Sequence, residues 1–311
     1  MKLRIGTRGS ALALFQARHI ATRLEALDHE TEIIIVKTKG DNDQVRPFAQ
    51  VGEPGLFVRE IEVALIEERI DVAVHCYKDL PSDSPAELIV SAMPEREDTR
   101  DRLLIAARAY DESAEGLPLV QGAHVGTASA RRQALVRHLR PDLKLGLLRG
   151  NVPTRVRKLA EGEFDAILLA SAGLARLDRA HEKGEGPALD RGETVELDLD
   201  PRVFVPAPSQ GALALQTRVA DETVRAAIDA LDDTPAHRAV SVERDLLAMV
   251  DAGCQVPFGA YCELGDNDEF ELHAALEVAG ELRRAVSSGS DAGALARTVF
   301  QALLPEGVRP R

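Results

Sequence analysis

Residues 72–81, VAVHCYKDLP, are the stretch from which we interpret the fold. The stretch opens with an apolar run between a helical pattern and a proline, which is typical of a short buried strand in a parallel sheet. His75, Lys78 and Asp79 follow at the carboxyl end of that strand, where open α/β sheets bind their ligands. The sequence therefore predicts an α/β fold with a lysine and a carboxylate facing a cleft, although a plain polar turn would also use Asp and Pro.

The chain before and after this stretch continues the α/β pattern. Residues 3–7 form an expected strand, and Ser10 is placed to cap a helix whose apolar positions keep helical spacing. The polar segment 39–54 has no periodicity, so it is either a lid over the site or a solvated loop. Further strands are expected at 33–36 and 88–93, and a helix at 56–68.

A dense charge run at 95–101, EREDTRD, interrupts the apolar pattern, and we interpret it as a crossing between two domains. A second α/β unit follows, and strands expected at 203–205 and 212–215 return to the first sheet. Two crossings between the same halves make a hinged pair of lobes, a common arrangement for closing on a ligand. The second unit has expected strands at 124–126, 145–148 and 164–170, a helix at 130–139, a helix capped by Asn151, and a short helix ending at Arg176.

From residue 221 the pattern changes to helices and alternating strands, which predicts a small α+β third domain. It contains an amphipathic helix at 238–249, a half-buried strand at 270–276 and a last helix at 292–304. We therefore expect lobe 1 at 1–95 and 202–218, lobe 2 at 101–195 and the third domain at 221–311, with hinges near 96–100 and 196–201.

The composition excludes several classes of protein. With 38 Lys and Arg against 51 Asp and Glu, the net charge is -13, which argues against nucleic acid as a general partner. No run approaches the ~18 apolar residues of a membrane span, and the strand at 3–7 leaves no room for a signal peptide, so we expect a cytoplasmic protein. Three cysteines make no disulfide framework, and no Cys/His spacing matches a metal site.

Arginines gather where the expected strands pass into helices. Arg8, Arg131, Arg132 and Arg149 lie at such turns, and Arg155 lies one turn into a helix. Backbone amides and the helix dipole already favour anions at these places. Each arginine alone would be an ordinary surface residue. Because guanidinium groups bind carboxylates bidentately, the set together predicts a site for a ligand with several carboxylates.

Cys254 is the second unusual residue, since it lies in a short loop marked by Gly253 and Pro257. A free thiol in an accessible loop suits covalent attachment of a group. Burial is the usual fate of a free cysteine, and we expect it for Cys76 and Cys262.

A series of motifs makes the chain resemble the porphobilinogen deaminase family almost from end to end. The resemblance implies two lobes like those of periplasmic anion-binding proteins, and a third domain whose cysteine carries a dipyrromethane cofactor through a thioether. It also implies a monomeric transferase, hydroxymethylbilane synthase, which condenses four porphobilinogen molecules with loss of ammonia and releases hydroxymethylbilane by hydrolysis, a step of haem biosynthesis. The motifs are LRIGTRGSALALFQA at 3–17, GLFVRE at 55–60, VAVHCYKDLP at 72–81, VGTASARRQ at 125–133, LRGNVPTRVRKL at 148–159, PSQGALAL at 208–215 and GCQVPFGAY at 253–261.

The resemblance also assigns roles to residues. Asp79 matches the family's catalytic aspartate, with Lys78 beside it, and Cys254 matches the cofactor cysteine. Phe57 matches an aromatic residue that packs over the substrate pocket. The acetate and propionate groups of the pyrroles would be held by Arg8, Ser10, Lys78, Thr127, Ser129, Arg131, Arg132, Arg149, Gly150, Arg155 and Arg176.

The chain departs from the family's pattern at several positions. Lysines that are usual in the lid are replaced by Gln50 and Pro54, and Cys76 stands where serine is usual. Pro208 and Ser209 replace the usual Val-Gly before Gln210, which is expected to stiffen the hinge.

A protein of another class would use the same arginines: a non-catalytic, two-lobed binder of a polycarboxylate, with the third domain as an interaction module. Such a binder needs neither Asp79 nor a modifiable Cys254. The intact mass of the purified protein therefore separates the two alternatives.

Overall fold

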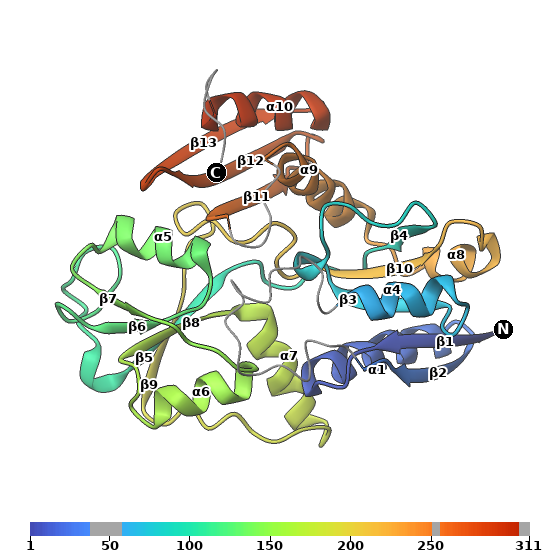
Figure 1. Ribbon diagram of the computed structural model, residues 1–311, viewed down its shortest axis with the longest axis horizontal. Helices are drawn as coiled ribbons and strands as arrows, with labels where there is room; N and C mark the ends of the chain where they lie inside the picture. The colour runs from blue at the N-terminus through green and yellow to red at the C-terminus, as the bar shows by residue number, and fades with distance from the viewer. Residues whose placement is uncertain (38–57, 251–255, 305–311) are drawn as a thin grey trace.

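The computed structural model describes residues 1–37, 58–250 and 256–304, and the strands in these ranges form three separate sheets. Figure 1 shows two of the sheets, each flanked by helices, beside one another, with the third above them. The first two are mixed sheets with parallel inner strands, and the third is antiparallel. The predicted fold class, two α/β lobes with a small α+β domain, is confirmed.

The first lobe is built on a sheet in the order β2-β1-β3-β10-β4. β1 runs parallel to β2 and β3, whereas β10 runs antiparallel to β3 and β4. The expected cap is confirmed, because the Ser10 hydroxyl accepts a hydrogen bond from the Ala13 amide at the start of α1. The elements are β1 (Lys2–Thr7), α1 (Ala11–Glu25), β2 (Glu30–Ile35), α4 (Arg59–Ile66), β3 (Val72–Cys76), the 3-10 turn η1 (Tyr77–Asp79), β4 (Leu88–Ala92) and β10 (Leu213–Arg218).

The second lobe repeats this topology with the order β7-β6-β8-β5-β9. β6 is parallel to β7 and β8, and β5 is antiparallel to β8 and β9. Ser129 and Asn151 cap two of its helices through their side chains. The elements are β5 (Asp101–Ala106), η2 (Ala107–Ala109), β6 (His124–Gly126), α5 (Ala130–Leu139), β7 (Lys144–Gly146), α6 (Val152–Ala160), β8 (Ala166–Ala170), α7 (Ser171–Glu182) and β9 (Thr194–Asp198).

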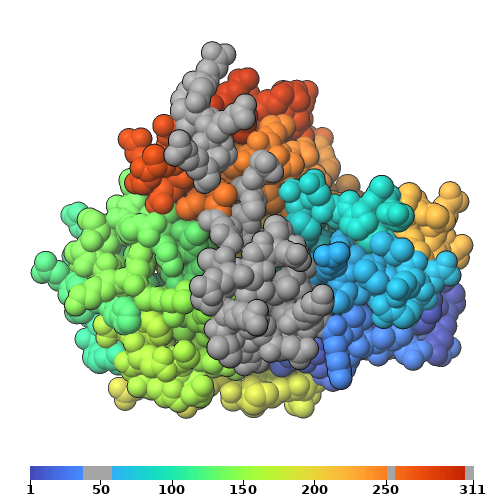
Figure 2. All heavy atoms as spheres, viewed as in Figure 1, coloured from blue at the N-terminus to red at the C-terminus, as the bar shows by residue number. Residues whose placement is uncertain are grey.

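The third domain packs two helices on a three-stranded sheet in the order β11-β12-β13. Its own apolar core includes Leu246, Leu272 and Val299. In Figure 2 its atoms, coloured orange to red, rest on both lobes. The elements are α9 (Thr234–Val250), β11 (Phe258–Leu264), β12 (Phe270–Val278), β13 (Glu281–Gly289) and α10 (Ala292–Leu303).

Helix α8 (Glu222–Asp229) lies on the first lobe, although we expected residues from 221 onward in the third domain. Val224 and Ile228 share an apolar core with Leu3 and Val72 of the first sheet. The helix follows β10 directly, so its apolar face is buried against the sheet that it has just left.

The two segments that cross between the lobes pair with each other. The Glu97 amide donates to the Gly211 carbonyl oxygen at 3.3 Å, and Arg96 Nε donates to the Gln210 carbonyl oxygen at 3.0 Å. Gly211 has a φ of +89°, and a Cβ there would lie 2.3 Å from the Glu97 carbonyl oxygen. Only glycine fits this contact, so the crossings approach more closely than side chains would allow.

Glu243 of α9 ties the third domain to both crossings. Its buried carboxylate accepts two hydrogen bonds from the Arg96 guanidinium, at 2.9 and 3.0 Å. It also accepts from the Ser209 amide at 2.7 Å and from the Cys262 amide at 2.8 Å. One carboxylate therefore fixes α9, β11 and the two crossings in one arrangement.

Several sequence-based expectations differ from the structure. Residues 203–205 are not a strand; instead Phe204 and Val205 are buried in the core of the second lobe. Arg176 lies in the middle of α7 rather than at a helix end, because the helix continues to Glu182. The segment 39–54, expected as a lid or a loop, lies outside the described residues. Within the described ranges, no helix is long and apolar enough to cross a bilayer.

Candidate active site

Lys78 and Asp79 lie on the 3-10 turn that follows β3, as the sequence predicts. The first residues of β3 are fully buried, whereas Lys78 is half-buried and Asp79 is exposed. The Tyr77 amide donates to the Ala212 carbonyl oxygen at 3.0 Å, which fastens the turn to the crossing beside β10. The strand therefore delivers a cation and a carboxylate to its carboxyl end on a short, fixed turn.

The Lys78 ammonium donates to Gln210 Oε1 at 3.2 Å. Burial lowers its pKa, and the positive charge of Arg132 lowers it further, while the negative charge of Asp79 acts in the opposite direction. Arg132 belongs to the second lobe and Asp79 to the first, so charges from both lobes act on Lys78.

Arg131 and Arg132 open helix α5 and are buried around one carboxylate. Arg131 Nη1 lies 2.7 Å from Asp101 Oδ2, and Arg132 Nη2 lies 2.6 Å from Asp101 Oδ1. Burial alone would raise the pKa of Asp101, but the two arginines hold it well below its usual range. Arg131 also donates to the Val205 carbonyl oxygen at 2.7 Å, and Arg132 to the Leu168 carbonyl oxygen at 2.9 Å.

Arg155 is aimed by the turn that precedes α6. Its Nε donates to the Gly150 carbonyl oxygen at 2.8 Å, and Gly150 has a φ of +112°, which favours glycine. Burial lowers the pKa of Arg155 to about 10, with further contributions from the charges of Arg132 and Arg149. Asp79 of the first lobe is the opposing charge. We call Lys78, Asp79, Arg132, Arg149 and Arg155 the interlobe site.

The other expected binding residues lie at the starts of helices, directly after strands, or on helix α7. Arg8 is half-buried directly after β1, and Ser10 and Ser129 are helix caps. Thr127 is buried, and its Oγ1 accepts from the Ser129 amide at 3.2 Å. Arg176 is buried on α7 and donates to the Gly211 carbonyl oxygen at 2.7 Å.

Phe57 and Cys254 lie outside the described residues, and so do Gln50 and Pro54. Cys262 is buried, as expected. Cys76 is only half-buried, contrary to our expectation, because it is the last residue of β3, where the strand leaves the core. Its Sγ accepts a hydrogen bond from Gln16 Nε2 at 3.2 Å.

Sequence reasoning missed Asp101, the residue that organises Arg131 and Arg132. Asp101 is the last residue of the charge run at 95–101, and nothing in the sequence of such a run distinguishes a buried aspartate from a solvated one. Sequence reasoning also assigned no role to Gln210, whose side chain contacts Lys78 and Asp101. A glutamine in a turn that contains proline and glycine carries no local signal of such contacts.

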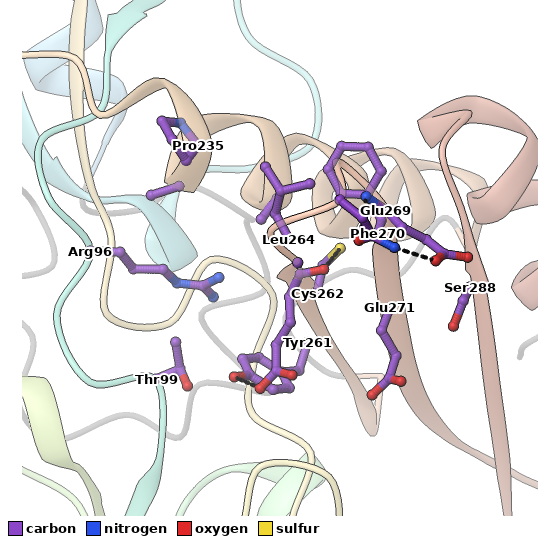
Figure 3. Close-up of a pocket in the computed structure, with 15 residues that line it drawn as sticks. Arg96, Thr99, Pro235, Tyr261, Cys262, Leu264, Glu269, Phe270, Glu271 and Ser288 are labelled. Carbon is purple, nitrogen blue, oxygen red and sulfur yellow. Dashed lines mark hydrogen bonds between the residues drawn. The ribbon is translucent and has the colours of Figure 1, made fainter.

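A cavity of about 580 Å³ lies elsewhere, between the first crossing and the third domain. Figure 3 shows Arg96 and Thr99 on one side of it and Tyr261 and Cys262 of β11 on another. Its lining includes the Glu263 carboxylate, which already accepts a hydrogen bond from the Tyr261 hydroxyl at 2.5 Å. None of the residues of the interlobe site lines this cavity.

Two α/β lobes that present a lysine, arginines and one aspartate to each other define a class of protein that handles a polyanionic small molecule. Comparison with known families gives the particular one. Residues 3–226 match the porphobilinogen deaminase, dipyromethane cofactor binding domain, and residues 237–299 match the porphobilinogen deaminase C-terminal domain. The chain belongs to the porphobilinogen deaminase family.

Curated relatives cover nearly the whole chain. A porphobilinogen deaminase of Syntrophobacter fumaroxidans is 42% identical over 99% of this chain and 96% of its own length. One of Brevibacillus brevis is 40% identical over 98% of this chain and 95% of its own length.

Among solved structures, this chain is similar to a periplasmic substrate-binding protein of an ABC transporter from Coxiella burnetii. The match covers 78% of this chain and 96% of that protein, at 13% identity and a TM-score of 0.41.

Family membership confirms the expected activity. The protein is a transferase, a hydroxymethylbilane synthase, that polymerises porphobilinogen on a dipyrromethane cofactor in tetrapyrrole biosynthesis. The alternative, a non-catalytic binder of a polycarboxylate, is not supported.

Proposed function

We propose that the interlobe site is where this reaction takes place, with Asp79 as the catalytic carboxylate and the arginines as the groups that hold substrate carboxylates. The observation that carries the proposal is the charge around Arg155. Its guanidinium is partly buried beside Arg132 and Arg149, and Asp79 is the negative charge that acts on it from the other lobe. Binding several carboxylates to such a cluster of cations is favourable, because the negative charges offset the repulsion between the cations.

The substrate and the dipyrromethane both fit these side chains. Every pyrrole unit carries an acetate and a propionate, and guanidinium groups bind carboxylates bidentately. We infer that the carboxylates are held by Arg8, Ser10, Lys78, Thr127, Ser129, Arg131, Arg132, Arg149, Gly150, Arg155 and Arg176, with Phe57 packing over the substrate. When bound, the dipyrromethane supplies an anchored pyrrole carbon to which substrate units are added.

Asp79 acts on the substrate in two ways. When the C–N bond of the protonated aminomethyl group breaks, ammonia leaves with the electron pair and the pyrrole ring becomes cationic. An ionised carboxylate within hydrogen-bond reach of the ring N–H stabilises that charge. After a free pyrrole carbon has attacked the cationic unit and the new C–C bond has formed, the same carboxylate can take up the proton that leaves the attacking ring carbon. Lys78 beside it holds a substrate carboxylate.

We propose that Cys254 carries the dipyrromethane through a thioether. Support comes from the two other cysteines, whose thiols form a reactive thiolate less readily than an ordinary thiol. Burial raises the pKa of the Cys262 thiol far above its ordinary value, so a reactive thiolate is disfavoured there. Burial also raises the pKa of Cys76, which contacts Gln16.

Arg149→Leu and Arg155→Leu test the site, with Arg157→Leu as a matched control. Arg157 lies on the same helix as Arg155, but it is exposed and pairs with Glu161. Intact mass after incubation with porphobilinogen should show successive additions in the wild type and the control. Both test variants should stop at or before the first addition. A normal series of masses in both would remove these arginines from substrate binding.

We also propose a cytoplasmic monomer whose lobes move about hinges at 96–100 and 196–201. Both cysteines in the described ranges are free thiols, which suits a reducing compartment. The interlobe site takes all of its side chains from one chain, so no second copy is needed to complete it.

A further inference from the structure

Gln210 lies at the point where both crossings meet the interlobe site, and its side chain is fully buried. Its amide group makes three hydrogen bonds. Nε2 donates to the Thr99 carbonyl oxygen at 2.8 Å and to Asp101 Oδ1 at 3.1 Å, and Oε1 accepts from the Lys78 ammonium at 3.2 Å.

These partners fix which way the amide points. The carbonyl oxygen of Thr99 and the carboxylate of Asp101 are acceptors, so they require the NH₂ end of the amide. The Lys78 ammonium is a donor and requires the oxygen end. A flipped amide would turn all three contacts repulsive, so Oε1 is held on Lys78.

The contacts form one polar chain across the molecule. Lys78 belongs to the first lobe, and Gln210 to the crossing that returns from the second. Asp101 begins β5 of the second lobe and binds Arg132 at 2.6 Å. A change in the alignment of the crossings would therefore shift the positions of Lys78 and Arg132 together.

We propose that Gln210 is a positioning residue for the reaction: it holds the Lys78 ammonium at the interlobe site and links its position to the alignment of the two crossings. The inference rests on the proposed role of Lys78 in holding a substrate carboxylate. It adds a residue that does not itself touch the substrate.

The surroundings of Lys78 make the acceptor important. Burial and the charge of Arg132 on α5 both favour neutral Lys78. The charged form is favoured by Asp79 on the same turn and by Asp101 on β5. Cys76 at the end of β3 adds no charge, because burial raises the pKa of its thiol. Gln210 Oε1 accepts a hydrogen bond from Lys78, and this bond is stronger when Lys78 is a charged ammonium. Gln210 therefore also favours the charged form.

The first experiment compares Gln210→Leu with Gln216→Leu. Gln216 is also fully buried and hydrogen-bonded, to His75 and Glu62, but it does not contact Lys78. The pKa of Lys78, followed by NMR of ¹⁵N-labelled lysine and assigned with Lys78→Arg, should fall by about one unit in Gln210→Leu. The basic limb of the kcat/KM profile should move to lower pH by a similar amount. Gln216→Leu should leave both unchanged, even though it also loses stability.

A double-mutant cycle with Lys78→Met completes the test. If Gln210 acts through Lys78, Gln210→Leu should lower kcat/KM about tenfold in the wild type but have little further effect in Lys78→Met. Additive losses, or an unchanged Lys78 pKa in Gln210→Leu, would overturn the positioning role alone. A Lys78→Met variant with wild-type kcat/KM would instead overturn the role of Lys78 on which the inference rests.

Discussion

Arg132 and Arg155 face the same site but differ in what balances their charge. Arg132 is paired directly with the buried carboxylate of Asp101 at 2.6 Å. The pKa of Arg155 is lowered to about 10 by burial and by two neighbouring arginines, and Asp79 opposes them. A carboxylate that binds at Arg155 therefore relieves more repulsion than one that binds at Arg132. We infer that Arg132 mainly shapes the site and that Arg155 mainly holds ligand.

Asp79→Asn should lower kcat by on the order of 10² or more, because the amide keeps the size and an acceptor of the side chain but loses its charge. Asp79→Glu keeps the charge and should retain measurable activity. Single-turnover kinetics on cofactor-loaded protein measure the condensation step directly. An unchanged condensation rate in Asp79→Asn would make Asp79 a turn residue, as its exposed place on η1 also permits.

Cys254→Ser should give a folded, inactive protein without a covalent pyrrole adduct, since an alkoxide forms far less readily than a thiolate near neutral pH. Intact mass measures the adduct. Cys76→Ser and Cys262→Ser are the matched controls and should both keep it, because Cys262 is buried and Cys76 contacts Gln16. An adduct that persists in Cys254→Ser would show that another residue carries the cofactor.

At the scale of elements, β3 is held by a buried polar network that no proposed catalytic step uses. His75 Nε2 lies 3.2 Å from Gln216 Oε1, and Gln216 Nε2 donates to Glu62 at 3.0 Å. Burial lowers the pKa of His75 to about 4, so the imidazole is neutral in the folded protein. The network joins β10 and α4 to β3, the strand that leads into the turn that carries Asp79.

The stability of the protein should therefore fall between about pH 6.5 and pH 4, where the unfolded chain protonates His75 and the folded chain does not. The contribution is fully present above pH 6.5 and amounts to about 3 kcal/mol at most. Burial raises the pKa of Glu62, so protonation of Glu62 makes the folded protein more stable as the pH falls. This effect opposes that of His75, and it is present in both the wild type and His75→Gln. Denaturant unfolding across this range should show a smaller pH dependence in His75→Gln. The exposed His138→Gln should behave as wild type, and an equal slope in all three proteins would exclude His75 as the cause.

The second crossing contains strain at Ser209. This residue has a φ of 63° and is fully buried, and within the described residues its Oγ has no hydrogen-bond partner. A left-handed conformation costs a non-glycine residue roughly 1–2 kcal/mol. Glycine avoids this cost, but its more flexible unfolded chain offsets part of the gain in stability. The expected stiff hinge therefore contains a locally unfavourable residue.

Ser209→Gly should raise the free energy of unfolding by about 1 kcal/mol or more, because it removes both the strain and the unpaired hydroxyl. Ser209→Ala is the matched comparison, since it removes the hydroxyl but keeps the strain, and it should gain less. Thermal unfolding measures both. A destabilised Ser209→Gly protein would show that the backbone is not strained at this position.

At the scale of the whole molecule, the local elements could be predicted and the contacts between distant segments could not. Ser10 and Asn151 cap helices as expected, because capping depends on residues three positions away. Asp101 binds Arg131, 30 positions along the chain, and Gln210 binds Asp101 across 109 positions. No local pattern encodes such pairs. The arginine set could be recognised because each member follows a strand, whereas the residues that orient it could not.

The net charge of -13 opposes the approach of an anionic substrate, whereas the interlobe site attracts it. Which effect controls capture can be decided from the sign of the salt dependence. Screening acts over a Debye length of ~10 Å at 0.1 M salt, so it weakens whichever long-range field dominates at the mouth of the site. If the local arginines dominate, kcat/KM should fall several-fold as ionic strength rises from about 0.02 to 0.3 M.

Arg155→Leu should flatten this dependence, because it removes a cation that the protein leaves poorly compensated, and Arg157→Leu on the same helix should not. Because Arg155→Leu should stop at or before the first addition, its salt dependence is measured as binding of porphobilinogen at low concentration, and the same measurement is made on the wild type and on Arg157→Leu. A kcat/KM that rises with salt in the wild type would mean that the overall negative charge dominates. In that case the arginines would act only after the substrate has arrived, through direct contact rather than attraction at a distance.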